Sequence, residues 1–310
     1  MRVLLTGAAG LIGSHLAEHL LDRGDDVVAI DNFVSGSPAN VAALQDRSAF
    51  TFVEADVAEP WPDLGVFDAI AHLASPASPS DFGRIPIQIL RAGSIGTLSA
   101  LELAADQGAR CLVASTSEVY GEPLVHPQHE SYFGNVNPVG PRSCYDEAKR
   151  FTEAAAMAFR RSRDANTVIV RIFNTYGPRM RPTDGRVVST FVSQALAGAP
   201  ITLHGVGSQT RSFCYVDDQV RGIVAALESD HPGPINLGNP AEFTVREVAE
   251  MVLELTGADV PLVTVPLPED DPTRRRPDIT LAQTELGWEP TVDLRDGLER
   301  TIAYFRSLAS

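Results

Sequence analysis

The residues best suited to chemistry in this sequence are Tyr145 and Lys149, in the run Tyr-Asp-Glu-Ala-Lys. Residues four apart lie on one face of a helix, so the phenol and the ammonium can act together. The ammonium, with the positive ring of an oxidised nicotinamide, would lower the pKa of the phenol. A tyrosinate there can accept the proton of a substrate alcohol while hydride leaves the same carbon. We therefore predict that Tyr145 and Lys149 are catalytic.

A nicotinamide needs a dinucleotide site, and the start of the chain has the pattern for one. Gly7, Gly10 and Gly13 follow the apolar run 3–5. Glycines at a strand-to-helix junction permit a tight turn and a close approach of the backbone to a pyrophosphate. A second apolar run ends in Asp31, whose carboxylate can bind ribose hydroxyls and would repel a 2′-phosphate. The sequence predicts NAD rather than NADP, bound by Gly7, Gly10, Leu11, Ile12, Gly13, Asp31, Asn32, Asp56, Val57, Leu73, Tyr145 and Lys149.

Alternating strands and helices must position these residues. Helical periodicity predicts long helices over 85–107 and 143–163, and apolar runs predict strands at 3–5, 26–30, 50–53, 67–72, 110–114 and 167–171. This alternation is typical of an α/β fold with a Rossmann-like, doubly wound parallel sheet. After residue 173 the chain is rich in Pro, Gly and Arg, which indicates a smaller C-terminal α/β lobe. We expect an NAD-binding domain over 1–173 with a return segment near 215–238, and a discontinuous substrate-binding lobe mainly over 174–310.

Composition narrows the class of protein. The chain has 310 residues and a net charge of −15, which argues against binding to nucleic acid or to an anionic membrane. The three cysteines and seven histidines show no metal-ligand spacing, so we expect no metal. Sparse cysteines indicate reduced thiols. With a strand beginning almost at the N-terminus and no long apolar run, we expect no signal peptide, no membrane span and a cytoplasmic location.

The set Gly7, Gly10, Gly13, Asp31, Thr116, Tyr145 and Lys149 resembles the extended short-chain dehydrogenase/reductase superfamily, which includes NAD-dependent epimerases and dehydratases. Within it the chain is similar to the UDP-glucuronate decarboxylases, or UDP-xylose synthases. The similar segments span nearly the whole chain: 72–79, 115–121, 126–128, 135–138, 140–147, 171–179, 184–188, 207–213, 236–240, 270–272, 275–278 and 286–290. The resemblance implies an NAD-dependent lyase of carbohydrate biosynthesis. It would decarboxylate UDP-glucuronate to UDP-xylose through a 4-keto intermediate and return hydride to C4.

The resemblance also implies roles for the run Ser115-Thr-Ser-Glu118. Thr116 and Tyr145 would stabilise the oxyanion that develops as CO2 leaves. Ser117 stands where 4,6-dehydratases have an acid, and a hydroxyl does not readily protonate a leaving group. Glu118 would crowd the substrate carboxylate electrostatically or handle a proton. We therefore count Thr116, Ser117 and Glu118 among the catalytic residues.

Substrate contacts follow from the same resemblance. Arg275 would bind the uronate carboxylate, as the matching position does in the family. Arg186 and Arg211 would face the phosphates or the carboxylate, and Asn174 and Val187 would contact the sugar nucleotide. The sequence leaves open which of three consecutive arginines, Arg274, Arg275 and Arg276, points inward.

Two other functions stay open at this point. One is a 4-epimerase or 4,6-dehydratase of the same superfamily, acting on UDP-glucuronate or another nucleotide sugar. The other is a catalytically idle protein that senses a dinucleotide, although the intact Thr116, Tyr145 and Lys149 argue against it. In similar proteins the helices corresponding to 85–107 and 143–163 pair in a four-helix interface. Both helices here have enough apolar positions to be covered on two sides, so we expect a homodimer.

Overall fold

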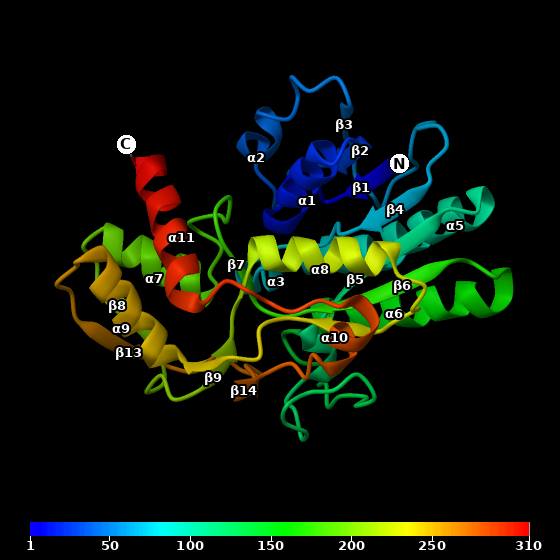
Figure 1. Ribbon diagram of the computed structural model, residues 1–310. Helices are drawn as coiled ribbons and strands as arrows, with labels where there is room; N and C mark the ends of the chain where they lie inside the picture. The colour runs from blue at the N-terminus through cyan, green and yellow to red at the C-terminus, as the bar shows by residue number, and fades with distance from the viewer. Residues whose placement is uncertain (310) are drawn as a thin grey trace.

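The computed structural model describes residues 1–309, and its centre is a seven-stranded parallel sheet (Figure 1). The strands lie in the order β11-β6-β5-β4-β1-β2-β3. The order reverses between β1 and β4, and in such sheets ligands bind beyond the carboxyl ends of the strands at that point. The Rossmann-like sheet expected from the sequence is confirmed. The strand bounds are Arg2–Thr6 (β1), Asp26–Asp31 (β2), Phe50–Glu54 (β3), Ala69–His72 (β4), Arg110–Thr116 (β5), Thr167–Ile172 (β6) and Ile235–Leu237 (β11).

Helices cover both faces of the sheet because its strands are apolar on both sides. The buried side chains of β1 show this: Val3 and Leu5 pack with residues of α1 and α8, and Leu4 packs with residues of α5 and α6. Two short helices, α2 and α3, follow β2 and β4. None of the helices among residues 1–309 is long and apolar enough to cross a membrane. The bounds are Leu11–Asp22 (α1), Pro38–Ala42 (α2), Pro79–Phe82 (α3), Pro86–Arg91 (α4), Thr97–Gln107 (α5), Ser143–Arg163 (α6) and Val216–Glu228 (α8).

The helix expected over 143–163 is α6, but the helix expected over 85–107 is not a single α-helix. It begins at Pro86, and a π-helical turn, η1 (Ala92–Gly96), separates α4 from α5. Close packing explains the glycines there: a Cβ on Gly93 would lie 2.7 Å from the Cβ of Ala148 in α6. The π-helical turn therefore lies where this segment packs closely against α6, the helix that carries Tyr145 and Lys149.

A second lobe, toward the left of Figure 1, contains the remaining elements except α10, which packs on α8 and β11. The chain leaves the sheet after β6, and it returns through α8 and β11. Three short pairings or sheets hold this lobe together: β13 with β8, β10 with β7, and β12-β9-β14. The bounds are Thr175–Tyr176 (β7), Val187–Leu196 (α7), Ile201–His204 (β8), Thr210–Ser212 (β9), Cys214–Tyr215 (β10), Glu242–Thr244 (β12), Val245–Thr256 (α9), Leu262–Val265 (β13), Arg274–Arg275 (β14), Thr280–Leu286 (α10) and Leu294–Ala309 (α11).

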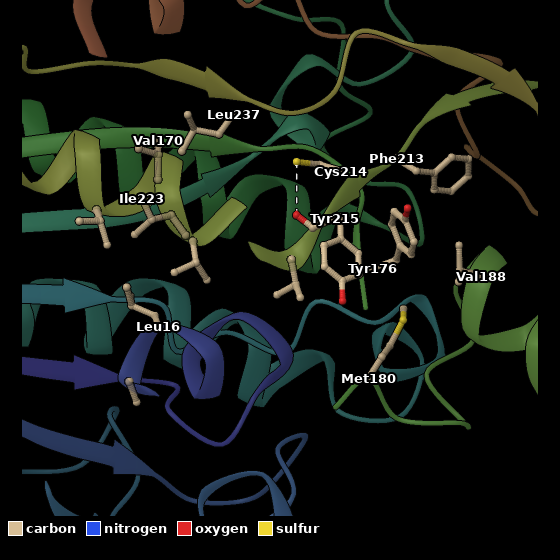
Figure 2. Packing of buried hydrophobic residues seen from close by; sticks show 14 of the residues in the cluster. Leu16, Val170, Tyr176, Met180, Val188, Phe213, Cys214, Tyr215, Ile223 and Leu237 are labelled. Carbon is tan, nitrogen blue, oxygen red and sulfur yellow. Dashed lines mark hydrogen bonds between the residues drawn. The ribbon is translucent and has the colours of Figure 1, made fainter. Parts of the chain in front are cut away.

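The two lobes share one continuous apolar core. Figure 2 shows Leu16 of α1 and Ile223 of α8 in the same cluster as Tyr176, Tyr215 and Val188 of the second lobe. The rings of Tyr176 and Tyr215 meet edge to face, with centroids 5.7 Å apart. Because a close-packed core resists deformation, this contact fixes how residues from the two lobes face each other.

Candidate active site

The turn after β1 fits a dinucleotide pyrophosphate. Gly7 has φ of 75°, in the left-handed region, and a Cβ there would lie 2.8 Å from the backbone nitrogen of Ala74. A Cβ on Gly13 would lie 2.0 Å from the carbonyl oxygen of Gly7. Helix α1 starts directly after Gly10, and no side chain caps its N-terminus. The first N–H groups of α1 therefore remain available for a phosphate, as the glycine pattern predicts.

Asp31 is fixed at the end of β2. Its Oδ2 accepts a hydrogen bond from the backbone of Ala9 (2.9 Å), and its Oδ1 accepts one from Phe33 (2.8 Å). Burial raises the pKa of this carboxyl, while the two backbone donors oppose the shift. Each oxygen keeps a further lone pair for a ribose hydroxyl. Other expected cofactor residues line the same cleft: Gly7, Gly10, Leu11, Ile12, Gly13, Asn32, Asp56, Val57 and Leu73.

Asp31→Asn should weaken NAD binding by about tenfold to 100-fold, because charge-assisted hydrogen bonds contribute about 1.5–3 kcal/mol. Loss of the negative charge should weaken NADP binding less, so the preference for NAD should shrink. Titration of the cofactor-free protein with each nucleotide measures both dissociation constants. Asp26→Asn, an exposed change on the same strand, is the control. An unchanged ratio of the two constants would show that Asp31 does not select the cofactor.

Tyr145 and Lys149 lie in the first turns of α6, beside the carboxyl end of β5. The Lys149 ammonium donates a hydrogen bond to the carbonyl of Ala114 (2.7 Å) and lies 5.8 Å from the centroid of the Tyr145 ring. The Tyr145 side chain stacks on Phe82, with centroids 5.2 Å apart. Both residues are buried and both line the cleft. The helix therefore holds the phenol and the ammonium toward one space.

The surroundings of Tyr145 act on the pKa of its phenol in opposite directions. Burial raises the pKa of Tyr145 above its usual value, and a hydrogen bond with Thr116 partly offsets this. Burial also lowers the pKa of Lys149 to about 8. A positive charge beside the phenol, as an oxidised nicotinamide would provide, would lower the phenol pKa. The expected lowering by Lys149 and the nicotinamide together therefore stays a prediction.

The residues from Ser115 to Glu118, at the end of β5, differ in whether they line the cleft. Thr116 and Glu118 line the cleft, and the Thr116 hydroxyl accepts a hydrogen bond from the backbone of Glu118 (3.2 Å). Ser117 is buried but is not among the described residues that line the cleft. The backbone turns tightly here, as a short 3₁₀ segment (Ser117–Tyr120). The catalytic role expected for Ser117 stays a prediction.

Glu118 is the centre of a charge cluster. Its Oε2 accepts hydrogen bonds from Arg142 (2.8 Å) and from Arg275 (3.3 Å). Burial opposes ionisation of Glu118, but the charges of Arg275 and Arg142 outweigh it and lower the pKa of the carboxyl to about 2. The same environment acts in the opposite direction on Asp146, where burial and the nearby Glu118 raise the pKa to about 7. Glu118 is therefore a carboxylate at neutral pH and has no proton to donate.

Arg275 is the arginine of its run that points inward. It is 1% exposed, whereas Arg274 is exposed and Arg276 is half-buried. Strand β14 pairs with β9, and Arg275 is the register partner of Arg211. Both line the cleft, as do Asn174, Arg186 and Val187. Arg186 forms an ion pair with Asp184, so its charge is partly balanced within the protein.

The cleft that joins these groups has a volume of about 410 Å³ and runs from Gly7 and Asp31 to Arg211 and Arg275. Charged residues of the cleft that sequence reasoning did not single out include Arg142 and Asp271. Asp271 pairs with Arg211 (2.9 Å). Arg142 stands three residues before Tyr145, a spacing that places two residues on one helix face, and this signal could have identified it. Asp271 lies in a loop without periodic spacing, and its only signal was its place in the similar segment 270–272.

Comparison with known proteins identifies several relatives. Residues 3–238 match the NAD dependent epimerase/dehydratase family. The chain is 50% identical over 307 residues to UDP-glucuronic acid decarboxylase 1 of Arabidopsis thaliana, covering 99% of this chain and 70% of that protein. The crystal structure of UDP-glucuronic acid 4-epimerase from Bacillus cereus, in complex with UDP-glucuronic acid and NAD, has a TM-score of 0.89 at 31% identity and covers 99% of this chain and 100% of that one. A dTDP-glucose 4,6-dehydratase of Streptomyces venezuelae with NAD bound has a TM-score of 0.90 at 30% identity and covers 99% and 97%.

Proposed function

This chain belongs to the NAD dependent epimerase/dehydratase family, and we propose that within it the protein is an NAD-dependent lyase that decarboxylates UDP-glucuronate to UDP-xylose. The observation that carries the proposal is the half-buried Glu118 carboxylate with the buried Arg275 beside it, in the cleft that Tyr145 also lines. Similarity to UDP-glucuronic acid decarboxylases over nearly the full chain supports the same substrate. In this proposal residues 1–173, with the return segment near 215–238, form the NAD-binding domain. The lobe made mainly of 174–310 binds the nucleotide sugar; Ser310 lies outside the described residues.

The chemistry divides among the residues of the cleft. NAD, held by the glycine turn and Asp31, would supply the hydride acceptor for oxidation at C4 and the hydride for the later reduction. Tyr145 accepts the proton of the C4 hydroxyl, and Thr116 orients that hydroxyl. Oxidation at C4 makes the substrate a β-keto acid, which loses CO2 with its electrons passing to the C4 oxygen. Thr116 and Tyr145 stabilise the resulting enolate, and C5 then takes up a proton from water, which restores the C4 ketone for reduction.

Glu118 and Arg275 act on the departing carboxylate. Arg275 is buried and cationic, so it can bind the uronate carboxylate. Glu118 is ionised, so its charge repels that carboxylate and favours departure of neutral CO2. The residue type at position 117 also argues against the 4,6-dehydratase alternative, which needs an acid where Ser117 stands.

The second candidate is a UDP-glucuronate 4-epimerase, favoured by the fold it shares with the Bacillus cereus enzyme. Incubation of the purified protein with UDP-glucuronate, followed by NMR of the nucleotide-sugar product, separates the candidates. UDP-xylose supports the decarboxylase, UDP-galacturonate supports the epimerase, and no conversion supports a dinucleotide-sensing protein.

Arg275→Ala should weaken binding of UDP-glucuronate and leave binding of UDP nearly unchanged. The lost charge-assisted pair is worth about 1.5–3 kcal/mol, or about tenfold to 100-fold in affinity. Isothermal titration of each ligand measures the difference. Arg274→Ala, the exposed neighbour on the same strand, should change neither affinity. Equal weakening of UDP and UDP-glucuronate by Arg275→Ala would place this arginine at the phosphates.

We propose that the protein is a homodimer through α4, η1 and α6. Large apolar side chains of these elements are exposed, among them Ile87 (63%), Leu90 (39%), Ile95 (41%) and Phe151 (40%). Sedimentation at micromolar concentration should show a dimer, and Ile87→Asp should shift it toward monomer. Phe133→Asp, an exposed aromatic change in a loop, is the control. A monomeric wild-type protein would contradict the assignment.

We also propose a cytoplasmic location. Cys111, Cys144 and Cys214 are buried free thiols, which suits a reducing compartment.

A further inference from the structure

Three arginines surround the two carboxylates at the substrate end of the cleft. Arg142 and Arg275 bind Glu118, while Arg211 and, at 3.7 Å, Arg142 face Asp271. Nothing in the proposed reaction yet uses Arg142. Its side chain is 13% exposed, lines the cleft and lies over the ring of Phe82, 5.4 Å from the centroid.

The contacts of Arg142 differ from those of Arg275. Arg142 makes the shorter hydrogen bond to Glu118, at 2.8 Å against 3.3 Å. Within residues 1–309, Nε and Nη1 of Arg275 are buried without a hydrogen-bond partner, so Arg275 has two such donors to spare, whereas Arg142 has one, its Nε. A buried donor without a partner is unfavourable, and a substrate carboxylate would satisfy both.

We propose that Arg142 is a positioning residue: it holds the Glu118 carboxylate in place, so that Arg275 is free to bind the carboxylate of the substrate. The inference rests on the proposed function and deepens it. Arg142 directly precedes α6, and its carbonyl accepts the backbone N–H groups of Tyr145 and Asp146. The same residue therefore ties the Glu118 turn to the start of the helix that carries the catalytic tyrosine.

Without Arg142, two effects follow from the geometry. Arg275 becomes the only hydrogen-bonding cation left to Glu118, so the protein carboxylate and the substrate carboxylate compete for one guanidinium. Two further groups act on the charge of Glu118. They are the Arg211 guanidinium and the carboxyl of Asp146, whose own pKa is raised. The Tyr145 phenol also lies close to Glu118. With one cation fewer, Glu118 should take up a proton at a higher pH than in the wild-type protein.

A double-mutant cycle tests whether Arg142 acts through Glu118. The four proteins are wild type, Arg142→Gln, Glu118→Gln and the double variant, and the readout is CO2 release from UDP-glucuronate. We expect Arg142→Gln to lower kcat/KM by about tenfold or more alone, and by less than about threefold when Glu118 is already Gln. Equal fold losses in both backgrounds would overturn the proposal, because Arg142 would then act independently of Glu118.

The pH profile gives a second test that a purely structural residue would not move. In Arg142→Gln, Glu118 should take up a proton at a higher pH than in the wild type, so kcat/KM should begin to fall at a higher pH on the acidic limb, and this earlier fall should be absent when Glu118 is also Gln. In Arg142→Lys, which keeps a cation, the limb should stay close to that of the wild type. Identical limbs in all three proteins would contradict the proposal. Retention of NAD and unchanged affinity for UDP control for folding, and Arg142→Met, which also removes the cation, replaces Arg142→Gln in the cycle if the latter does not fold.

A failure of the proposed function can be told apart from a failure of this inference. If the wild-type protein releases no CO2, the decarboxylase assignment fails. The cycle is then run on the affinity for UDP-glucuronate, where Arg142→Gln should still weaken binding only while Glu118 is present to compete for Arg275.

Discussion

Tyr145→Phe is expected to retain NAD and UDP-glucuronate while turnover falls by roughly 10²–10⁴-fold. The ring of Tyr145 stacks on Phe82, and phenylalanine keeps that contact, so the helix and the cleft should be undisturbed. What is lost is the oxygen that accepts the C4 proton. Single-turnover reduction of bound NAD by UDP-glucuronate measures the affected step directly.

Two further variants sharpen this result. Tyr132→Phe removes a phenol that hydrogen-bonds only a loop backbone, at Leu124, and should leave turnover unchanged. Lys149→Met should reduce both turnover and retention of NAD. The buried ammonium lies beside the ring of Tyr145, where its charge favours the tyrosinate, and it can also reach the ribose of the cofactor. Near-normal turnover in Tyr145→Phe would mean that another group takes the proton.

Glu118→Gln is expected to separate C4 oxidation from loss of CO2. The amide is nearly the same size but carries no charge, so the repulsion that favours departure of CO2 is removed. CO2 release should slow by about 10²-fold or more while NAD is still reduced, so NADH should accumulate. Absorbance of the reduced nicotinamide, followed together with CO2, measures both steps. Glu147→Gln, a more exposed change on α6, is the control. Equal slowing of oxidation and CO2 release would contradict a role confined to decarboxylation.

The lowered pKa of Glu118 adds a pH dependence to this prediction. A carboxyl whose pKa is depressed in the folded protein contributes stability above its unfolded value near 4.5, and loses it as the pH falls toward about 2. In wild-type protein, Glu118 should therefore stay ionised over the whole neutral range. Above about pH 4.5, the profile of activity against pH should therefore have the same shape in Glu118→Gln as in the wild type.

Much of the sheet and of the cofactor site could be predicted from local sequence. Residues 110–114 and 143–163 carry strong apolar periodicity, and the tyrosine and lysine stand on the second of these segments. The glycine turn is equally local, because its backbone geometry depends on adjacent residues. These features need no knowledge of distant contacts.

The substrate end of the cleft depends on contacts between distant segments. Arg211 and Arg275 become neighbours only because β9 pairs with β14, strands of three and two residues that leave no periodic signal. The break in the helix over 85–107 likewise coincides with close packing on α6. Tertiary packing decides both features, so the sequence could name the arginines but not say which one points inward.

The central claim is that CO2 leaves from a 4-keto intermediate and that the same hydride returns to C4. The most direct measurement uses UDP-glucuronate labelled with deuterium at C4 and with carbon-13 at the carboxyl carbon. We predict labelled CO2 and UDP-xylose that retains deuterium at C4. UDP-galacturonate that keeps the labelled carboxyl, or UDP-xylose that has lost its deuterium to solvent, would contradict the account.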